Sequence, residues 1–167
     1  MNRETDRIGE IQMYTVRNVT ENDCGILRFL ASKCGPLDVH TPYTYWVASC
    51  YYGKSSFILE HDGEPIGFIM SVDTPDAVFI WQIGVLSNYR RKNLSCELIS
   101  KCFAYARNAG KDLEATIAKD NLPSYNALRR ACEKHNFTIE QLEEVVIHDM
   151  ADDSFEEKEI RYRIRAA

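Results

Sequence analysis

The feature that most restricts the fold of this chain is the apolar run Ala77–Val85, which leads through a basic, polar loop into residues 94–106. A nearly continuous apolar run of this length predicts a strand that is buried in the middle of a sheet. In residues 94–106 the apolar side chains recur at helical spacing, which predicts a helix that Gly110 ends. Ligands of such sheets bind where the carboxyl end of a strand meets the amino end of a helix. We therefore expect a binding site just beyond Val85.

The remaining elements are predicted from periodicity, helix caps and turn residues. Asp62-Gly63 is a strong hairpin signal, Thr41-Pro42 starts a helix, and Asn121 with Pro123 starts another. The expected strands are 14–19, 56–60, 65–72, 77–85, 113–117, 139–148 and 159–164, with an acidic loop between the last two, and the expected helices follow Thr20, span 43–52, begin at 94 and run from 121 to about 135. This order predicts a mixed sheet with helices on both faces. Residues 1–13 are polar and are expected to form a flexible arm ahead of a single domain, 14–167.

Composition argues against several kinds of partner. The formal net charge of −5 disfavours binding to nucleic acid or to an anionic membrane surface. No apolar run approaches the roughly 20 residues that are needed to span a bilayer. The six cysteines include no C-x-x-C pair and lie apart from the four histidines, so no metal site is expected. Since the chain shows no signal-peptide pattern, we expect free thiols and a cytoplasmic location.

Three cations, Arg90, Arg91 and Lys92, lie directly ahead of the helix expected at Leu94. Backbone N–H groups and the positive end of a helix dipole bind pyrophosphate, and the cations would strengthen such a site. The alternative is a solvated basic turn, because basic residues ahead of a helix are common. Spacing alone does not separate the two interpretations.

Around this loop the chain resembles the GNAT acetyltransferases. Phe79–Val85, with Arg90 and Leu94, is similar to their central strand, pyrophosphate loop and helix, and specifically to the F-[LIV]-W-Q-V-A-V run of L-2,4-diaminobutyrate acetyltransferases. Gly35–Tyr45 resembles the P-P-L-D-V-N-S-x-Y-x-Y segment of that narrower family, and Leu113–Ser124 resembles its L-E-T-T-I-T-P-D-N-x-A-S segment. The resemblance implies the GNAT acyltransferase fold, of the α/β (α+β) class. That fold has a mixed, mostly antiparallel sheet of about six to seven strands, flanked by about four helices.

The resemblance also implies the residues of the site. Acetyl-CoA would contact Ile83 and Val85 on the central strand, the loop residues Arg90, Arg91, Asn93, Leu94 and Ser95, and Asn121 and Ser124 at a helix start. The amine substrate would be bound by Asp38, Tyr43, Trp81 and Thr116, with Tyr45 also at the pocket wall. Carboxylates and aromatic faces suit the two ammonium groups of a diamino acid. Without the resemblance, Asp38 is interpreted as a loop or cap residue and Trp81 as core packing.

Glu159 aligns with the active-site glutamate in the family's closing H-D-x-E-x-L-x-R-I segment, which makes it the candidate catalytic base. Glu156 and Glu157 remain alternatives within the same acidic run. Many GNAT enzymes protonate the leaving sulfur with a tyrosine, but the corresponding place here is Ala127-Leu128. Tyr125 lies nearby in a different register, so no general acid is assigned.

Two segments depart from the family. Arg90–Ser95 replaces R-G-x-G-[LM]-[AG] and contains neither glycine. Asparagine tolerates positive φ better than most residues, so Asn93 can keep the turn. His40 and Thr41 replace the family's Asn-Ser beside the substrate site.

The function that the resemblance implies is transfer of acetyl from acetyl-CoA to the 4-amino group of L-2,4-diaminobutyrate. The product is N4-acetyl-L-2,4-diaminobutyrate, an intermediate of ectoine biosynthesis. One alternative is a GNAT enzyme for another small amine or amino acid, because of His40 and Thr41. Another is a non-catalytic binding protein of GNAT fold, because of the glycine-free loop and the missing tyrosine. The resemblance also implies a homodimer, with the tyrosine-rich helix or the tail strands as contacts.

Overall fold

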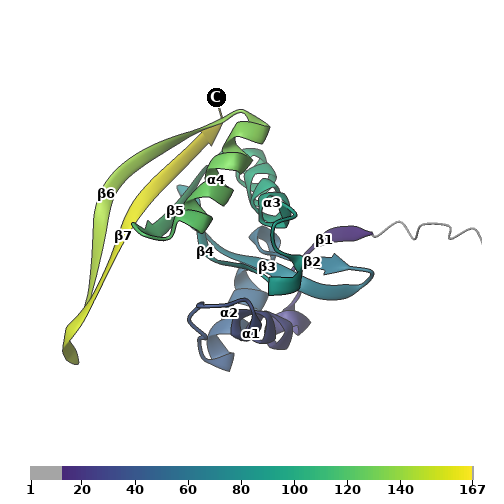
Figure 1. The fold of residues 1–167 in the computed structure, drawn as a ribbon, viewed down its shortest axis with the longest axis horizontal. Coiled ribbons are helices and arrows are strands. Elements are labelled where there is room, and N and C mark those ends of the chain that lie inside the picture. Colours follow the sequence, from purple (N-terminus) through teal and green to yellow (C-terminus); the bar gives the residue numbers. More distant parts are fainter. Residues whose placement is uncertain (1–12, 167) are drawn as a thin grey trace, which may run out of the picture.

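A computed structural model describes residues 13–166, which form one seven-stranded sheet with four α-helices. The strands are β1 (Tyr14–Asn18), β2 (Phe57–His61), β3 (Glu64–Asp73), β4 (Ala77–Val85), β5 (Asp112–Ala118), β6 (Phe137–Asp149) and β7 (Asp152–Ala166), and the helices are α1 (Cys24–Lys33), α2 (Pro42–Tyr52), α3 (Leu94–Asn108) and α4 (Leu122–His135). The strand order is β1-β2-β3-β4-β5-β7-β6 (Figure 1). Only β4 and β5 pair in parallel among these strands, so the predicted mixed, mostly antiparallel GNAT sheet is confirmed.

Helices cover both faces of the sheet. In Figure 1, α1 and α2 lie below the strands and α3 and α4 lie above them. Each layer has its own apolar core. One centres on Leu27, Tyr45 and Phe68, and the other on Leu98 and Phe103. The central strand β4 lies between the two layers, as its apolar run predicts.

Local signals in the sequence locate most elements closely. The strand predicted at 77–85 has the observed bounds of β4. The hairpin between β2 and β3 turns at Asp62 and Gly63, which have φ values of 51° and 86°, as a two-residue hairpin turn requires. Helix α2 begins as predicted, because the Thr41 hydroxyl accepts a hydrogen bond from the Thr44 N–H at 3.2 Å.

The prediction of an acidic loop between residues 148 and 159 is wrong. Most of this segment belongs to β7, which pairs with β6 as far as Asp149↔Asp152. Its charged side chains are exposed on a ribbon, where they do not oppose strand formation, and the partner strand supplies the hydrogen bonds. The predicted flexible arm, residues 1–13, lies outside the described residues except for Met13, whose N–H donates to the Asp62 carboxylate at 3.2 Å.

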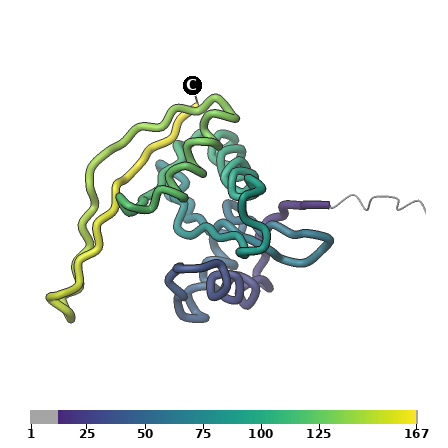
Figure 2. Tube along the Cα trace, viewed as in Figure 1, coloured from purple at the N-terminus to yellow at the C-terminus, as the bar shows by residue number. Residues whose placement is uncertain are grey.

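The β6–β7 hairpin extends well beyond the rest of the sheet. Pairing of β7 with β5 ends at Ala118↔Glu159, so residues 152–158 pair only with β6. Figure 2 shows the two strands here as long, curved tubes that run side by side and project from the domain. We call the part formed by residues 144–158 the arm.

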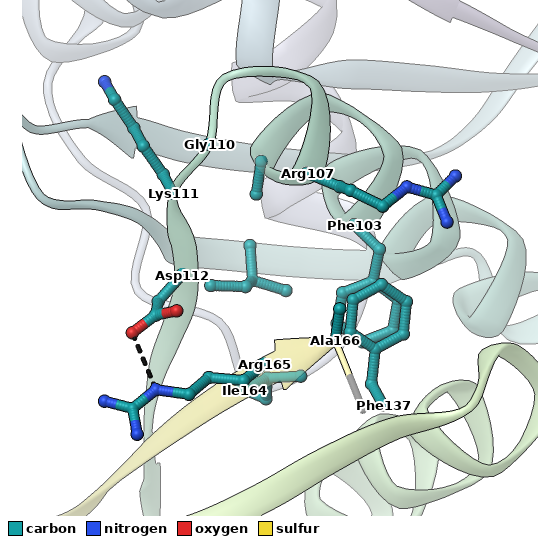
Figure 3. A pocket seen from close by; sticks show the side chains of 11 residues that line it. Phe103, Arg107, Gly110, Lys111, Asp112, Phe137, Ile164, Arg165 and Ala166 are labelled. Atoms are coloured by element: carbon teal, nitrogen blue, oxygen red, sulfur yellow. Dashed lines mark hydrogen bonds and ion pairs between the residues drawn. The ribbon is translucent and has the colours of Figure 1, made fainter.

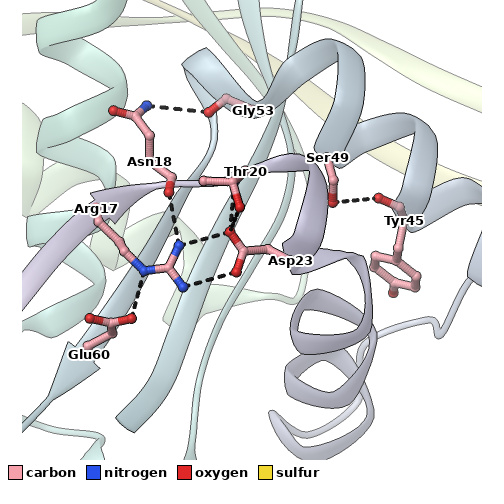
Figure 4. Close-up of polar contacts among 8 residues, drawn as sticks. All are labelled: Arg17, Asn18, Thr20, Asp23, Tyr45, Ser49, Gly53 and Glu60. Atoms are coloured by element: carbon pink, nitrogen blue, oxygen red, sulfur yellow. Dashed lines mark hydrogen bonds and ion pairs between the residues drawn. The ribbon is translucent and has the colours of Figure 1, made fainter. Parts of the chain in front are cut away.

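A buried carboxylate joins β1 to the helical layer. Both oxygens of Asp23 accept hydrogen bonds from Arg17, at 2.8 and 3.0 Å, and Arg17 also donates to Glu60 at 2.7 Å (Figure 4). The Thr20 N–H and hydroxyl donate to Asp23 as well. Burial alone would raise the pKa of Asp23, but the hydrogen bonds from Arg17 and Thr20 outweigh burial and hold this pKa below its ordinary value.

We expect Asp23→Ala to lower the free energy of unfolding by about 2–3 kcal/mol at pH 7, because it removes charge-assisted bonds from a buried site. Since the folded-state pKa of Asp23 is lowered, its stabilising contribution is present above the unfolded-state pKa and is lost as the pH falls through the folded-state value. Urea unfolding at several pH values measures both effects. Glu133→Ala is the control, because it removes only an exposed pair with Arg129 and should cost less than about 0.5 kcal/mol. Equal losses in the two variants would contradict this account.

Candidate active site

The central strand separates from its neighbour in the middle of the sheet. β4 pairs with β5 only from Ala77 to Ile80, although β4 continues to Val85 and β5 to Ala118. On the other side of β4, the register with β3 shifts between Met70 and Ser71, which leaves Trp81 as the additional residue of a β-bulge. From Trp81 to Val85 the β4 edge that faces β5 is thus without a strand partner among residues 13–166.

A cavity of about 160 Å³ occupies the opening between the two strands. Six of the predicted site residues line it: Trp81, Ile83, Thr116, Asn121, Ser124 and Glu159. They come from β4, β5, the start of α4 and β7, so residues far apart in the sequence surround one space. The apolar part of the wall includes Leu37, Ile99 and Leu128.

Glu159 is the carboxylate of the acidic run that lies at this cavity. It pairs with Ala118 at the end of β5 and with Val145 on β6. Glu156 and Glu157 lie farther along the exposed arm, and Glu156 forms an ion pair with Lys158 at 2.6 Å. The placement therefore favours Glu159 among the three alternatives.

Three residues that were predicted at the substrate, Asp38, Tyr43 and Tyr45, do not line the cavity. Asp38 follows Leu37, and its carbonyl oxygen accepts a hydrogen bond from Gln82 Nε2 at 2.7 Å, while its side chain is not part of the cavity wall. Tyr43 is 71% exposed and stacks on Trp46, with ring centroids 5.6 Å apart. The inward position on this turn of α2 is taken by the buried Tyr45, so Tyr43 points outward.

The loop ahead of α3 adopts the backbone that glycines would favour. Arg91 and Asn93 have φ values of 64° and 57°, at the two positions where the family pattern has glycine. Asparagine enters this left-handed region with little strain, whereas arginine pays about 1 kcal/mol or more to do so. The turn before Leu94 is therefore kept without glycine, and the first N–H groups of α3 remain available for an anion.

The three cations of this loop have different surroundings. Arg90 donates to the Val85 carbonyl at 3.1 Å and to the Cys34 carbonyl, so its guanidinium braces the loop against α1. Lys92 donates to the Tyr14 hydroxyl at 3.1 Å. Arg91 is exposed and forms no ion pair or side-chain hydrogen bond with another described residue.

Leu94, Val85 and Ser95 also lie where the resemblance places them, at the end of β4 and the start of α3. Leu94 is 7% and Val85 9% exposed, so these two side chains belong to the core and only their backbones can face a ligand.

Sequence reasoning missed two residues near the site, Arg130 and Gln82, and singled out a third, His40, only as a departure from the family. Arg130 on α4 donates to the Asn93 side chain at 3.4 Å and adds a cation beside the loop. Gln82, which is 7% exposed, and His40 connect the strand to the segment around Asp38. A glutamine in an otherwise apolar strand was the one available signal, because a buried amide needs partners.

A larger cavity, of about 350 Å³, lies at the opposite end of β5 (Figure 3). The stacked rings of Phe103 and Phe137 form its apolar floor, and Arg107 and Arg165 lie at its rim. It contains none of the predicted site residues, and Arg165 is paired with Asp112 at 3.0 Å. We place the candidate active site in the smaller cavity, because the split strands, the bulge and six of the predicted site residues meet there.

A central strand that splits from its parallel neighbour in front of a helix amino end defines an acyltransferase of GNAT type. The sequence profile described as the Acetyltransferase (GNAT) family matches residues 26–133, so the chain belongs to this family. In the described residues, no helix is long and apolar enough to cross a membrane.

Individual relatives show which acetyltransferases of this family the chain is similar to. The L-2,4-diaminobutyric acid acetyltransferase of Oceanobacillus iheyensis is 31% identical over 158 residues, which cover 90% of this chain and 87% of that protein. The protein of the same name from Vibrio parahaemolyticus is 30% identical over 105 residues, 60% of this chain and only 58% of its own length. The structure of diaminobutyrate acetyltransferase EctA from Paenibacillus lautus, in complex with its substrate L-2,4-diaminobutyric acid and coenzyme A, superposes with a TM-score of 0.73. It is 22% identical and covers 92% of this chain and 95% of that one, which shows the shared fold.

Glycine substitutions at two neighbouring residues of the left-handed turn should change the free energy of unfolding in opposite directions. Arg91→Gly should raise the free energy of unfolding by about 0.5–1 kcal/mol, because glycine relieves the positive φ at position 91. Lys92→Gly should lower it by about 1 kcal/mol or more, because Lys92 is not in the left-handed region, so glycine increases the freedom of the unfolded chain and also removes the hydrogen bond from Lys92 to Tyr14. Chemical denaturation of both variants tests this. A loss of stability in Arg91→Gly would show that the backbone at this position is not strained.

Proposed function

We propose that this protein transfers the acetyl group of acetyl-CoA to the 4-amino group of L-2,4-diaminobutyrate and so serves ectoine biosynthesis. The observation that carries the proposal is the cavity at the split of β4 and β5, where Trp81, Thr116 and Glu159 line one space. Similarity over most of the chain to an L-2,4-diaminobutyric acid acetyltransferase supports the substrate.

The coenzyme would lie along the open edge of β4. Its pyrophosphate suits the first N–H groups of α3, with Arg91 and Arg130 as nearby cations. Its pantetheine arm contains amide groups, which can hydrogen-bond the unpaired backbone edge between Trp81 and Val85 as an added strand would. Asn121 and Ser124 lie at the cavity end of this path, near the place of the sulfur.

The amine would enter from the side of Trp81. Trp81 is 37% exposed at the cavity wall, so its ring can face an ammonium group. Thr116 can contribute a hydroxyl and Glu159 a carboxylate to the same substrate. Asp38, which follows Leu37 of the cavity wall, is the candidate partner for the second ammonium group.

Transfer requires a neutral amine. The Glu159 carboxylate would take a proton from the 4-ammonium group, directly or through a water molecule, and the freed nitrogen would attack the thioester carbonyl. N–H groups of the bulged β4 edge can stabilise the oxyanion. The carbon–sulfur bond then breaks, the added nitrogen gives up its extra proton, the leaving thiolate takes up a proton, and the products are the amide and free coenzyme A.

A coenzyme A release assay tests this function. The purified protein should release coenzyme A from acetyl-CoA when L-2,4-diaminobutyrate is added. Glu159→Gln should lower the rate at least about tenfold, or about 1.4 kcal/mol of barrier, because the amide cannot accept the proton. Glu157→Gln is the matched control on the exposed arm and should change the rate less than about twofold.

Other outcomes of the assay separate the alternatives. Faster turnover of ornithine, lysine or another amine at equal concentration would assign the protein to a different substrate, which the change to His40 and Thr41 motivates. Failure to bind acetyl-CoA in calorimetry would indicate a non-catalytic binding protein and would overturn the proposal.

We further propose that the protein works as a cytoplasmic homodimer. All six cysteines are free and four of them are buried, which suits a reducing compartment.

The arm is a two-stranded ribbon, and ribbons of this kind are marginally stable alone in water. It also exposes Val146, Ile147, Phe155 and Met150, with exposed fractions of 41–99%. A second copy that covers the arm would bury these side chains and satisfy the open backbone edges.

Light scattering should therefore give twice the mass of one chain. Ile147→Asp combined with Phe155→Asp should weaken the dimer at least about tenfold, because it introduces charge where apolar contacts are lost. Met13→Asp is the control, since Met13 is also exposed but precedes the edge strand farthest from β6. A monomeric wild type, or equal dimer strength in both variants, would exclude the arm as the interface.

A further inference from the structure

We propose that His40 and Gln82 form a hydrogen-bonded clip that positions the segment Leu37–Thr41 over the amine side of the cavity. In this role His40 and Gln82 are positioning residues, and they determine how tightly the amine binds. The amine part of this inference rests on the proposed function, whereas the clip itself does not.

Gln82 is held at both ends of its side-chain amide. Its Nε2 donates to the Asp38 carbonyl at 2.7 Å, and its Oε1 accepts from the Tyr45 hydroxyl at 3.2 Å. Because a carbonyl oxygen can only accept, the atom that faces Asp38 must be the amide nitrogen. The orientation of the Gln82 amide is therefore determined by its partners.

The amide orientation determines the role of His40. The second N–H of Gln82 Nε2 points to His40 Nε2, at 3.2 Å. Since the amide nitrogen has no lone pair to offer, His40 Nε2 must accept this bond, which requires the neutral ring with its proton on Nδ1. The backbone N–H of His40 also donates to the Tyr45 hydroxyl, at 3.4 Å.

The His40 ring also contacts the wall of the cavity. Its centroid lies 5.1 Å from the Trp81 ring and 6.0 Å from the Tyr45 ring. His40 itself does not line the cavity, whereas its neighbours Leu37 and Trp81 do. It is placed to act through these residues rather than on the substrate directly.

The segment between Gly35 and Thr41 needs such support because it has no regular secondary structure. It carries Leu37, which is part of the cavity wall, and Asp38, the candidate partner for an ammonium group. The clip connects this segment to β4, beside the bulge at Trp81. Loosening it should weaken amine binding and leave the coenzyme side, at the α3 loop, unchanged.

Three substitutions at His40 distinguish the effect of its hydrogen bond with Gln82 from the effect of its ring. His40→Gln keeps an acceptor at similar reach, His40→Phe keeps a ring and removes the acceptor, and His40→Ala removes both. We expect His40→Phe and His40→Ala to raise the KM for L-2,4-diaminobutyrate about three- to tenfold, the effect of one lost hydrogen bond. The KM for acetyl-CoA and kcat should stay within about twofold, and His40→Gln should restore the amine KM to within about twofold of wild type.

A second measurement needs no substrate. In a Trp46→Phe background Trp81 is the one remaining tryptophan. Its fluorescence emission then reports on the contact with the His40 ring. Added His40→Ala should shift the emission to longer wavelength, because Trp81 loses a ring contact and gains water. If the wild-type protein transfers no acetyl group but His40→Ala still shifts the emission, the proposed function is contradicted and the clip is not. Unchanged emission in His40→Ala, a wild-type amine KM in His40→Phe, or an equal rise in the KM for acetyl-CoA would overturn the clip.

Discussion

The separation of β4 from β5 after Ile80 is the constraint on which the rest of the site depends. Paired strands satisfy each other's backbone groups, so a split inside a sheet leaves polar groups that require a partner. The bulge at Trp81 turns β4 away, and buried side chains on both faces hold it there. The opening is consequently built into the fold, and a coenzyme with amide groups can complete it.

The two ends of the opening differ in the charge of the groups around them. At the outer end the α3 amino terminus, Arg91 and Arg130 provide positive charge for an anion. At the inner end Glu159 provides a carboxylate and Trp81 an aromatic face. This arrangement suits the proposed function, in which an anionic cosubstrate and a cationic amine would bind at opposite ends with their reacting groups between β4 and β5.

Sequence reasoning located the elements with strong local signals. The apolar run of β4, the Asp62-Gly63 turn and the Thr41 cap each depend on neighbouring residues, and each was predicted correctly. The acidic segment 152–158 was misassigned because its strand is stabilised by pairing with β6, which no local pattern reveals. The resemblance placed both Tyr43 and Tyr45 at the substrate, and the sequence could not show that Tyr45 is buried and Tyr43 exposed.

By itself, the sequence determined the order of elements, the family resemblance and the residue types that are expected at a coenzyme site and an amine site. These follow from periodicity, caps and motifs, which act over a few residues. The tertiary structure alone decided that Glu159 rather than Glu157 lies at the cavity, that Arg91 takes a left-handed backbone, and that Gln82 joins His40 to Asp38. Such relations depend on strand register and on contacts across more than 40 residues of chain, which residue spacing does not encode.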